Sequence, residues 1–310
     1  MTKYHIPVLQ EKTIDFLQLR DNGIYVDVTL GGGGHTKAIL ETNRKVKVIA
    51  LDQDEDAIEE TIELKKRNTG RLTILHDNFK NLRTRLALER IKKIDGILFD
   101  LGVSSHQFDT AERGFSYNKD SFLDMRMDQD KALTAHKIVN TFNFDQLTSI
   151  FFDYGEERES KRIANAIVKA RTKKEIKTTK DLADIIENAV YSKYKIKAKS
   201  RIFQAIRICV NSELEILKSA LKDAIQVLKP KGRIVVISYH SLEDKIVKHL
   251  FKYEEKECTC PPGLLKCVCG KVSTIRILTK KPITPGGSEI RKNKRARSAK
   301  LRAAQKREDL

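Results

Sequence analysis

The sequence predicts an α/β protein in which a parallel sheet with helices on both faces is interrupted by an all-helical insertion. Three observations support this fold class. Short apolar runs of strand length alternate with helix-like stretches up to Asp100, and the same alternation returns after residue 211. From residue 113 to residue 210, apolar side chains recur at helical spacing instead. Strands separated by helices in this rhythm form parallel sheets that are covered on both faces.

The individual elements follow from this pattern. The predicted strands span residues 23–29, 46–52, 71–76, 95–100, 232–238 and 274–279, and predicted helices between them include 54–66, 82–91 and 213–228. Inside the insertion, Thr178 is expected to begin a helix as its N-cap, with Asp181 in the first turn. We therefore expect a discontinuous α/β domain, residues 1–112 and 211–310, and a helical domain, residues 113–210.

Charge is the strongest feature of the composition. The net charge is +18, and residues 291–302 are dense in Lys and Arg. A large positive charge attracts polyanions, so a nucleic acid is the expected partner, although a merely solvated basic tail is the alternative. The basic run has almost no large apolar residues to insert into an anionic membrane. Since no apolar run approaches the ~20 residues of a membrane span and no secretion signal is apparent, we expect a cytoplasmic protein.

Four of the five cysteines form two closely spaced pairs, Cys258 with Cys260 and Cys267 with Cys269. An odd number of cysteines at such spacing does not suggest a secreted disulfide framework. Two close pairs across a Pro-Pro-Gly turn could form a Cys₄ zinc site, but paired zinc ligands usually have two residues between them. Reduced free thiols are the favoured interpretation, and metal binding stays open.

The residues that carry chemistry follow the predicted strands. A glycine-rich turn, Asp27–His35, joins the first strand to a helix, which lets a ligand approach the backbone closely. The second strand ends in Asp52, Phe79 follows the third, and the fourth ends in Asp100. An acid at the second strand can bind the hydroxyls of a ribose, and an aromatic ring can stack on a purine. Taken alone, Asp52 is equally well explained as the N-cap of a helix, and Phe79 is equally well explained as a core residue.

The turn favours S-adenosylmethionine over a nicotinamide cofactor. Both ligands need the ribose-binding acid, but a dinucleotide also needs a cradle for its pyrophosphate. The four consecutive glycines followed by His35 depart from the Gly-x-Gly-x-x-Gly fingerprint and from the phosphate-binding loop of nucleotide hydrolases. S-adenosylmethionine has no phosphate, and its amino-acid end suits acids and polar groups. Besides a methyltransferase, a nicotinamide oxidoreductase and a non-catalytic RNA-binding assembly factor are the alternatives.

With these motifs in view, the chain resembles the RsmH/MraW family of ribosomal RNA cytosine-N4 methyltransferases almost from end to end. The motifs that carry the resemblance occur in the family's order. They are His5–Leu9, Asp27–His35, Asp100–Ser105, Arg113–Phe115, Leu123–Asp128, Tyr154–Arg158, Phe203–Ile208, Asn211–Leu214, Ser238–Lys245 and Arg297–Arg302. The resemblance implies a Rossmann-like S-adenosylmethionine-dependent methyltransferase with an inserted helical domain that recognises the substrate. The implied activity is methylation of the exocyclic N4 amine of cytosine 1402 in 16S ribosomal RNA, within the small subunit or its assembly intermediate.

The resemblance also implies the site residues. The cofactor would be bound by Gly33, Gly34, His35, Asp52, Phe79, Asp100 and Gln107. Asp100 is also the candidate acceptor for a proton of the target amine, although a role as cofactor ligand alone is at least as good an interpretation. The loop from Arg113 to Asp128 carries Phe115, Tyr117 and Phe122, which we expect either to meet the RNA or to pack the insertion.

Overall fold

The computed structural model describes residues 7–102, 110–261 and 266–308. The chain divides into two compact units, one formed by Met1–Gly102 with Leu214–Leu310 and the other by Val103–Glu213. The expected domain limits, 113 and 210, both fall inside the second unit. Within the described residues, no helix is both long and apolar enough to cross a membrane.

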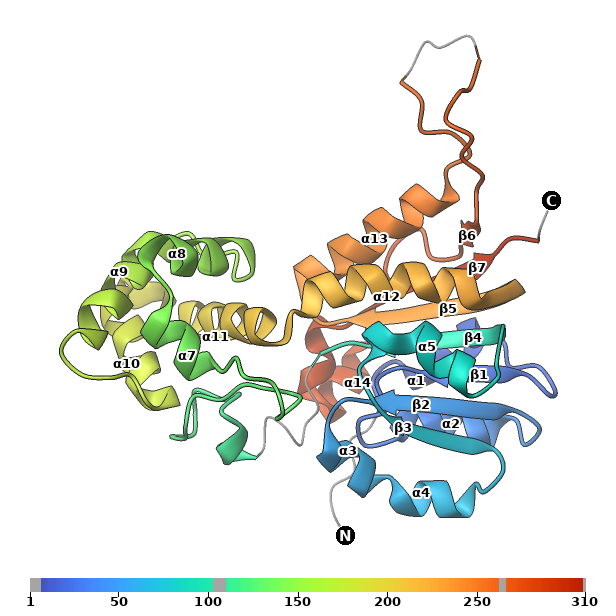
Figure 1. Ribbon diagram of the computed structural model, residues 1–310, viewed down its shortest axis with the longest axis horizontal. Coiled ribbons are helices and arrows are strands. Elements are labelled where there is room, and N and C mark those ends of the chain that lie inside the picture. Colours follow the sequence, from blue (N-terminus) through green and yellow to red (C-terminus); the bar gives the residue numbers. More distant parts are fainter. Residues whose placement is uncertain (1–6, 103–109, 262–265, 309–310) are drawn as a thin grey trace. The chain divides into compact units, whose positions relative to one another are not determined.

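The described residues of the first unit form one seven-stranded sheet (Figure 1). Its strands lie in the order β3-β2-β1-β4-β5-β7-β6, and β7 is antiparallel to both of its neighbours while the other pairs are parallel. The bounds are β1 Ile24–Asp27, β2 Lys47–Asp52, β3 Leu72–His76, β4 Ile94–Asp100, β5 Leu228–Ser238, β6 Ile275–Ile277 and β7 Lys300–Lys306. The six predicted strands are thus confirmed, and β7 is an addition that the sequence pattern did not reveal.

Helices cover both faces of this sheet, because alternate strand residues enter two separate cores. One core joins Val26, Ile97 and Phe99 to α5 and α12, and the other joins Tyr25, Leu98 and α2. The helices are α1 Gln10–Leu17, α2 Gly34–Thr42, α3 Glu55–Glu60, α4 Ile62–Arg67, α5 Leu82–Leu88, α12 Glu213–Val227, α13 Ser241–Glu255 and α14 Gly287–Lys292. This arrangement of a parallel sheet between two helical layers is the predicted Rossmann-like fold.

Strand β7 changes the interpretation of the basic C-terminal run. Leu301, Ala303 and Ala304 are fully buried, and the strand pairs with β5 from Ser238 to Arg233. Arg302 is also buried, and its guanidinium donates from Nε to Oδ1 of Asp244 at 2.6 Å and from Nη2 to Oδ2 at 3.3 Å. The expectation of a basic tail over residues 291–302 is therefore wrong for its last residues, since a buried acid neutralises Arg302 within the fold.

The second unit is helical, as predicted. Its described residues form α7 Ala135–Thr141, α8 Phe144–Asp153, α9 Ser160–Arg171, α10 Thr179–Ala189 and α11 Lys195–Asn211, with 3₁₀ turns at η2 Ala111–Arg113 and η3 Ser192–Tyr194. The predicted N-cap is confirmed: Thr178 Oγ1 accepts from the Asp181 N–H, and the Asp181 carboxylate accepts from the Thr178 N–H, both at 3.2 Å. Ile163, Ile167 and Ile186 lie in one shared core, which holds this unit together.

Candidate cofactor site

The candidate site lies where the order of the sheet strands reverses. Strands β1 and β4 are neighbours at the centre, and the chain proceeds outward from β1 to β2 and β3 on one side and from β4 to β5 on the other. Because these strands are parallel, their carboxyl ends share one edge, and Asp27, Asp52 and Asp100 are the last residues of β1, β2 and β4. Open α/β sheets bind their ligands at this edge, at the point of reversal.

The glycine-rich turn connects β1 to α2 and has one open side. Gly31 and Gly33 have φ angles of +47° and +73°, which glycine adopts readily. A Cβ atom at Gly33 would lie 2.8 Å from Leu64, and one at Gly34 would lie 2.9 Å from Pro7, whereas no atom lies within 4 Å of the corresponding point at Gly31. Gly33 and Gly34 therefore allow close packing of the turn, and the backbone is accessible at Gly31.

Asp52 faces this turn. The N–H of Gly31 donates to Asp52 Oδ2 at 2.8 Å, and the N–H of Asp54 donates to Oδ1 at 3.0 Å. Asp54, and not Asp52, is the N-cap of α3, since its side chain accepts from the Asp56 N–H. The structure thus decides against the N-cap interpretation of Asp52. The carboxylate is half-buried, and burial raises its pKa to about 6.

Phe79 begins the 3₁₀ turn η1, Phe79–Asn81, just after β3. Its ring meets the buried ring of Phe99 edge to face, with centroids 5.9 Å apart and an interplanar angle of 76°. The ring is only partly buried against the core around Phe99, so it retains an exposed portion. It can therefore support the core and also present a surface to an adenine.

Asp27 was not singled out by the sequence, yet it is the most buried acid of the three. Its Oδ2 accepts from the Thr36 hydroxyl at 2.8 Å, and its Oδ1 accepts from the Thr29 N–H at 3.2 Å. These bonds tie the end of β1 to the first turn of α2. Burial raises the pKa of Asp27 to about 6, although the nearby His35 and the hydrogen bonds lower it.

Asp100 is surrounded by groups from three separate parts of the chain. Its backbone N–H donates to Thr29 Oγ1 at 2.7 Å, the Tyr239 hydroxyl donates to its Oδ1 at 2.8 Å, and His35 Nε2 lies 3.5 Å from its Oδ2. Burial raises the pKa of Tyr239 well above its ordinary value, and the charge of Asp100 adds to this, so the phenol stays a donor. Tyr239 was missed, although it directly follows the predicted strand 232–238.

His35 is brought to Asp100 by the turn into α2. The ring is 5% exposed, and its distance from the carboxylate is that of an ion pair and exceeds that of a good hydrogen bond. Burial lowers the pKa of His35, but the neighbouring Asp100 and Asp27 outweigh this effect, and the pKa lies above its ordinary value. The sequence-predicted residues His35 and Asp100 thus form one cluster, whereas Gln107 lies outside the described residues.

These residues fit S-adenosylmethionine better than a dinucleotide. The strand ends place three acids at this edge, and the carboxylates of Asp52 and Asp100 are partly exposed while that of Asp27 is buried. S-adenosylmethionine carries a sulfonium and an ammonium group, which carboxylates attract, while a pyrophosphate would be repelled by them. The half-buried Asp52 can still accept from ribose hydroxyls.

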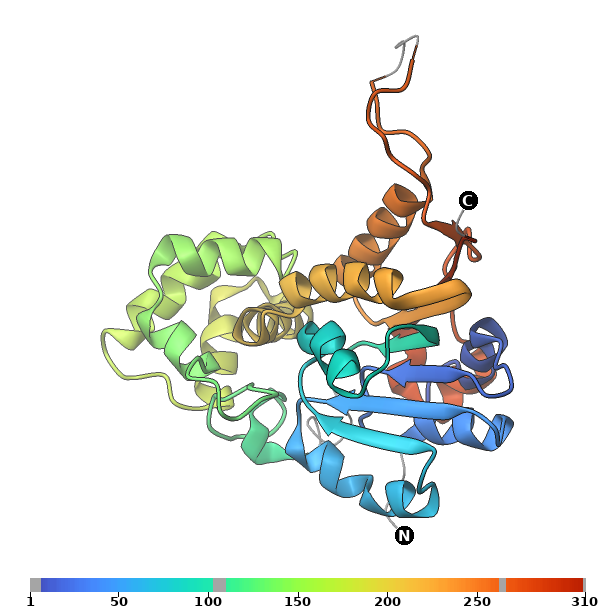
Figure 2. The same ribbon diagram turned by 45° about the vertical axis from the view of Figure 1, so that its right-hand side comes forward.

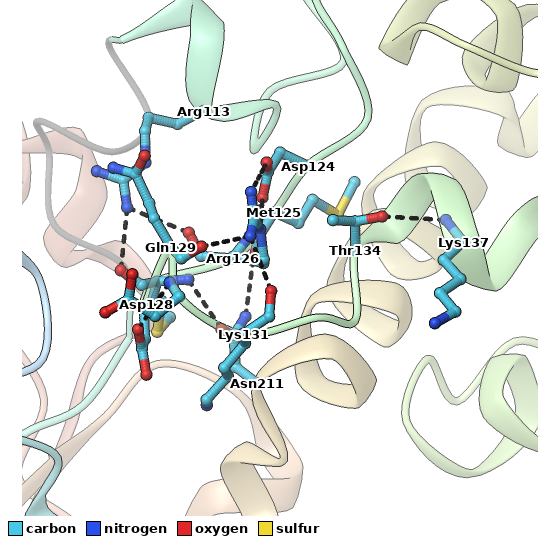
Figure 3. A network of polar contacts seen from close by, with 12 residues as sticks. Arg113, Asp124, Met125, Arg126, Asp128, Gln129, Lys131, Thr134, Lys137 and Asn211 are labelled. Carbon is cyan, nitrogen blue, oxygen red and sulfur yellow. Dashed lines mark hydrogen bonds and ion pairs between the residues drawn. The ribbon is translucent and has the colours of Figure 1, made fainter.

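In the helical unit, the predicted substrate loop is held by a network of polar contacts (Figure 3). The Arg126 guanidinium binds the Asp124 carboxylate through Nε at 2.7 Å and Nη2 at 2.8 Å, and its Nη1 donates to the Lys131 carbonyl at 2.7 Å. Asn211 accepts from the Met127 N–H at 2.9 Å and donates to the Met125 carbonyl at 2.8 Å. The motif residues Asp124, Arg126 and Asn211 therefore fix the backbone of this loop.

The three aromatic residues of the loop have different environments. Phe115 is 4% exposed and belongs to the core of the helical unit, so its ring is unavailable to a base. Tyr117 packs edge to face on Phe203, with centroids 5.4 Å apart. Phe122 is 49% exposed and stacks on His136. Of the three, Phe122 presents a ring to solvent.

Comparison with known proteins extends these observations. The model of the MraW methylase family matches residues 2–307. "Ribosomal RNA small subunit methyltransferase H" of Caldicellulosiruptor saccharolyticus is 53% identical over 304 residues, which cover 97% of this chain and 99% of that protein. The protein of the same name from Halothermothrix orenii is 48% identical over 306 residues, which cover 97% of this chain and 98% of that protein.

Solved structures similar to the chain include an rRNA methylase from Streptococcus thermophilus, with a TM-score of 0.45 and 12% identity over 98% of this chain and 100% of that chain. A putative rRNA-methylase from Clostridium thermocellum has a TM-score of 0.46 and 10% identity over the same shares. With its family match spanning nearly the whole sequence, and its acidic site at the reversal point of a Rossmann-like sheet, the chain belongs to the MraW methylase family of S-adenosylmethionine-dependent methyltransferases.

Proposed function

We propose that the protein transfers the methyl group of S-adenosylmethionine to the N4 amine of cytosine 1402 in 16S ribosomal RNA, in the cytoplasm, on the small subunit or its assembly intermediate. The observation that carries this proposal is the Asp100 carboxylate at the end of β4, which accepts a hydrogen bond from Tyr239 and lies beside His35. The relatives named for small-subunit ribosomal RNA, which share about half of their residues with this chain, support the same substrate.

The cofactor would bind along the edge formed by the strand ends. Asp52 would accept from the ribose hydroxyls, since Gly31 and Asp54 hold its carboxylate facing the turn. The exposed portion of Phe79 would contact the adenine, and Asp100 would close the site where the cofactor meets the target base. Gly33, Gly34 and His35 would shape the turn, and Gln107 stays a predicted contact. When bound, S-adenosylmethionine supplies an activated methyl group, and the protein aligns the acceptor with it at about 3–3.5 Å.

In the proposed reaction, Asp100 accepts a hydrogen bond from the target N4 amine and thereby orients it. The lone pair of a cytosine N4 amine is delocalised into the ring, so an acceptor for one N4 proton would favour attack by that nitrogen. Tyr239 donates to one Asp100 oxygen and His35 lies beside the other, so the carboxylate is fixed in one orientation. We place Asp100 as a hydrogen-bond acceptor that orients the target amine.

The helical unit would recognise the RNA. The target base has to be unpaired or flipped out of its stack, and proteins bind such nucleotides by stacking aromatic and guanidinium groups on the bases. Tyr191 is 71% exposed, and the Arg162 guanidinium lies 4.2 Å from the centre of its ring. Phe122 is a second exposed ring in this unit. These side chains would supply a surface on which unpaired RNA bases can stack.

The test is methylation of small ribosomal subunits from cells that lack this modification. The subunits are incubated with the protein and isotope-labelled S-adenosylmethionine, and the RNA is digested to nucleosides and analysed by mass spectrometry. Label in N4-methylcytidine, mapped to cytosine 1402 and lost with Asp52→Ala, is the expected result. Label in another nucleoside, or in another cytidine, would refute the proposed target.

A further inference from the structure

Residues 256–272 connect α13 to β6, and the described residues of this segment do not bury their own side chains. Figures 1 and 2 show the chain leaving the end of α13 in a long excursion and returning to the sheet at β6. Among the described residues of this segment, none is buried, and Val268 and Val272 are 78% and 63% exposed. A segment without a hydrophobic core needs another source of order to keep a defined shape.

The four cysteines of this segment nevertheless converge. The Sγ atom of Cys267 lies 3.4 Å from that of Cys258, 3.9 Å from that of Cys260 and 3.5 Å from that of Cys269, and Cys269 lies 3.8 Å from Cys258. All four sulfur atoms are within 4.8 Å of one another. None of these cysteines is in a disulfide, whose sulfur atoms would be about 2 Å apart.

These distances match a tetrahedral metal site. Zinc–sulfur bonds are about 2.3 Å long, so two sulfur atoms of a tetrahedral tetrathiolate lie about 3.8 Å apart. We propose that Cys258, Cys260, Cys267 and Cys269 bind one zinc ion and thereby fold the segment 256–272. The sequence alone favoured free thiols because of the one-residue spacing within each pair. The backbone accommodates this spacing by bringing the two pairs together from opposite arms of the segment.

The backbone around the sulfur atoms suits thiolates. The N–H groups of Cys260, Thr259 and Val268 donate to the Sγ atoms of Cys258, Cys269 and Cys260, at 3.3, 3.3 and 3.4 Å. Such bonds orient the ligands and disperse the negative charge of a tetrathiolate site. On binding, each thiol would release its proton to solvent as its sulfur bonds to zinc, with no change of oxidation state. Soft sulfur ligands in tetrahedral geometry select zinc among the common cellular divalent ions.

The test measures metal in the full-length protein purified without chelators. Elemental analysis is expected to find about one zinc per chain. Cys260→Ser and Cys269→Ser should each lose most of this zinc, whereas Cys209→Ser should keep it, because Cys209 lies in α11 of the helical unit and is not one of the four clustered cysteines. Circular dichroism of each variant shows whether it is folded. Cobalt in place of zinc should give the intense sulfur-to-metal absorption of a tetrathiolate.

A second measurement detects the folding of the segment. Removing zinc with a chelator should speed tryptic cleavage at Lys266 and Lys271, which flank the second cysteine pair, and leave the sheet intact. Wild-type protein that contains no zinc and binds cobalt without sulfur-to-metal absorption would overturn the proposal. So would fewer than five free thiols in the denatured, chelated chain, since missing thiols indicate disulfides. Iron in place of zinc would overturn the assignment of the metal.

Discussion

Replacing Arg302 with alanine distinguishes two roles for the basic C-terminal residues. If these residues serve to attract RNA, losing one arginine weakens RNA binding and leaves the fold unchanged. In the structure, however, Arg302 lies in β7 and binds Asp244 through two hydrogen bonds, of 2.6 and 3.3 Å. We therefore expect Arg302→Ala to destabilise the protein.

The expected loss of stability follows from the burial of the pair. The side chains of Arg302 and Asp244 are 9% and 12% exposed, so the substitution would leave a buried carboxylate without its main partner. Breaking a buried pair from one side costs about 3–5 kcal/mol. Lys300 lies 3.5 Å from the same carboxylate and offsets part of the loss, so we expect about 3 kcal/mol, at the lower end of that range.

Urea unfolding followed by circular dichroism measures this quantity. A loss of about 3 kcal/mol would lower the midpoint by about 1 M, since proteins of this size have slopes near 3 kcal/mol per molar urea. Arg297→Ala is the matched control, because Arg297 precedes β7 in the same basic run and is exposed, and it should change stability by less than about 0.5 kcal/mol. Equal stabilities for the two variants would refute the placement of β7 in the sheet.

Three further predictions concern the site and the helical unit. Because ionised Asp52 is needed to accept from the ribose and its pKa is about 6, calorimetric affinity for S-adenosylmethionine should fall roughly tenfold per pH unit below pH 6. A flat profile between pH 7 and pH 5 would contradict this. Tyr239→Phe should remain folded by circular dichroism but reduce turnover about 10- to 100-fold, because a donor to the Asp100 carboxylate is lost; unchanged turnover would contradict it. Thr178→Ala should lower the local stability of α10, measured by amide hydrogen exchange, by about 1 kcal/mol, and Thr178→Ser should lower it much less. Equal losses for the two variants would exclude a capping role for the Thr178 hydroxyl.

The parts of the fold that sequence predicted are those encoded locally. Each of the six predicted strands is an apolar run bounded by turn or helix signals, and such a run is buried wherever the chain forms a parallel sheet. The positions of Asp52 and Asp100 followed from the same reasoning, since the last residue of a parallel strand lies at the binding edge. Local signals also sufficed for Thr178, whose capping residues are three apart.

The parts that were missed depend on partners far away in the chain. Lys300–Lys306 contains a single large apolar residue, Leu301, and its Ala, Arg and Lys residues have no preference for strands. It becomes a strand because β5 offers a free edge and Asp244, 58 residues earlier, neutralises Arg302. Tyr239 and Asp100 are likewise 139 residues apart and meet only through the pairing of β4 with β5.

The position of β7 also constrains when the protein can fold during its synthesis. Strand β7 separates β5 from β6, and Ser238 pairs with Lys300, so many residues are translated after β5 before its neighbour exists. Until then the edge of β5 has unpaired N–H and C=O groups, which invite pairing with other chains. The helical unit, one continuous segment from Val103 to Glu213, can fold while the sheet is still incomplete. A ribosome that stalls before Lys300 would thus hold a folded insertion on an open, aggregation-prone sheet.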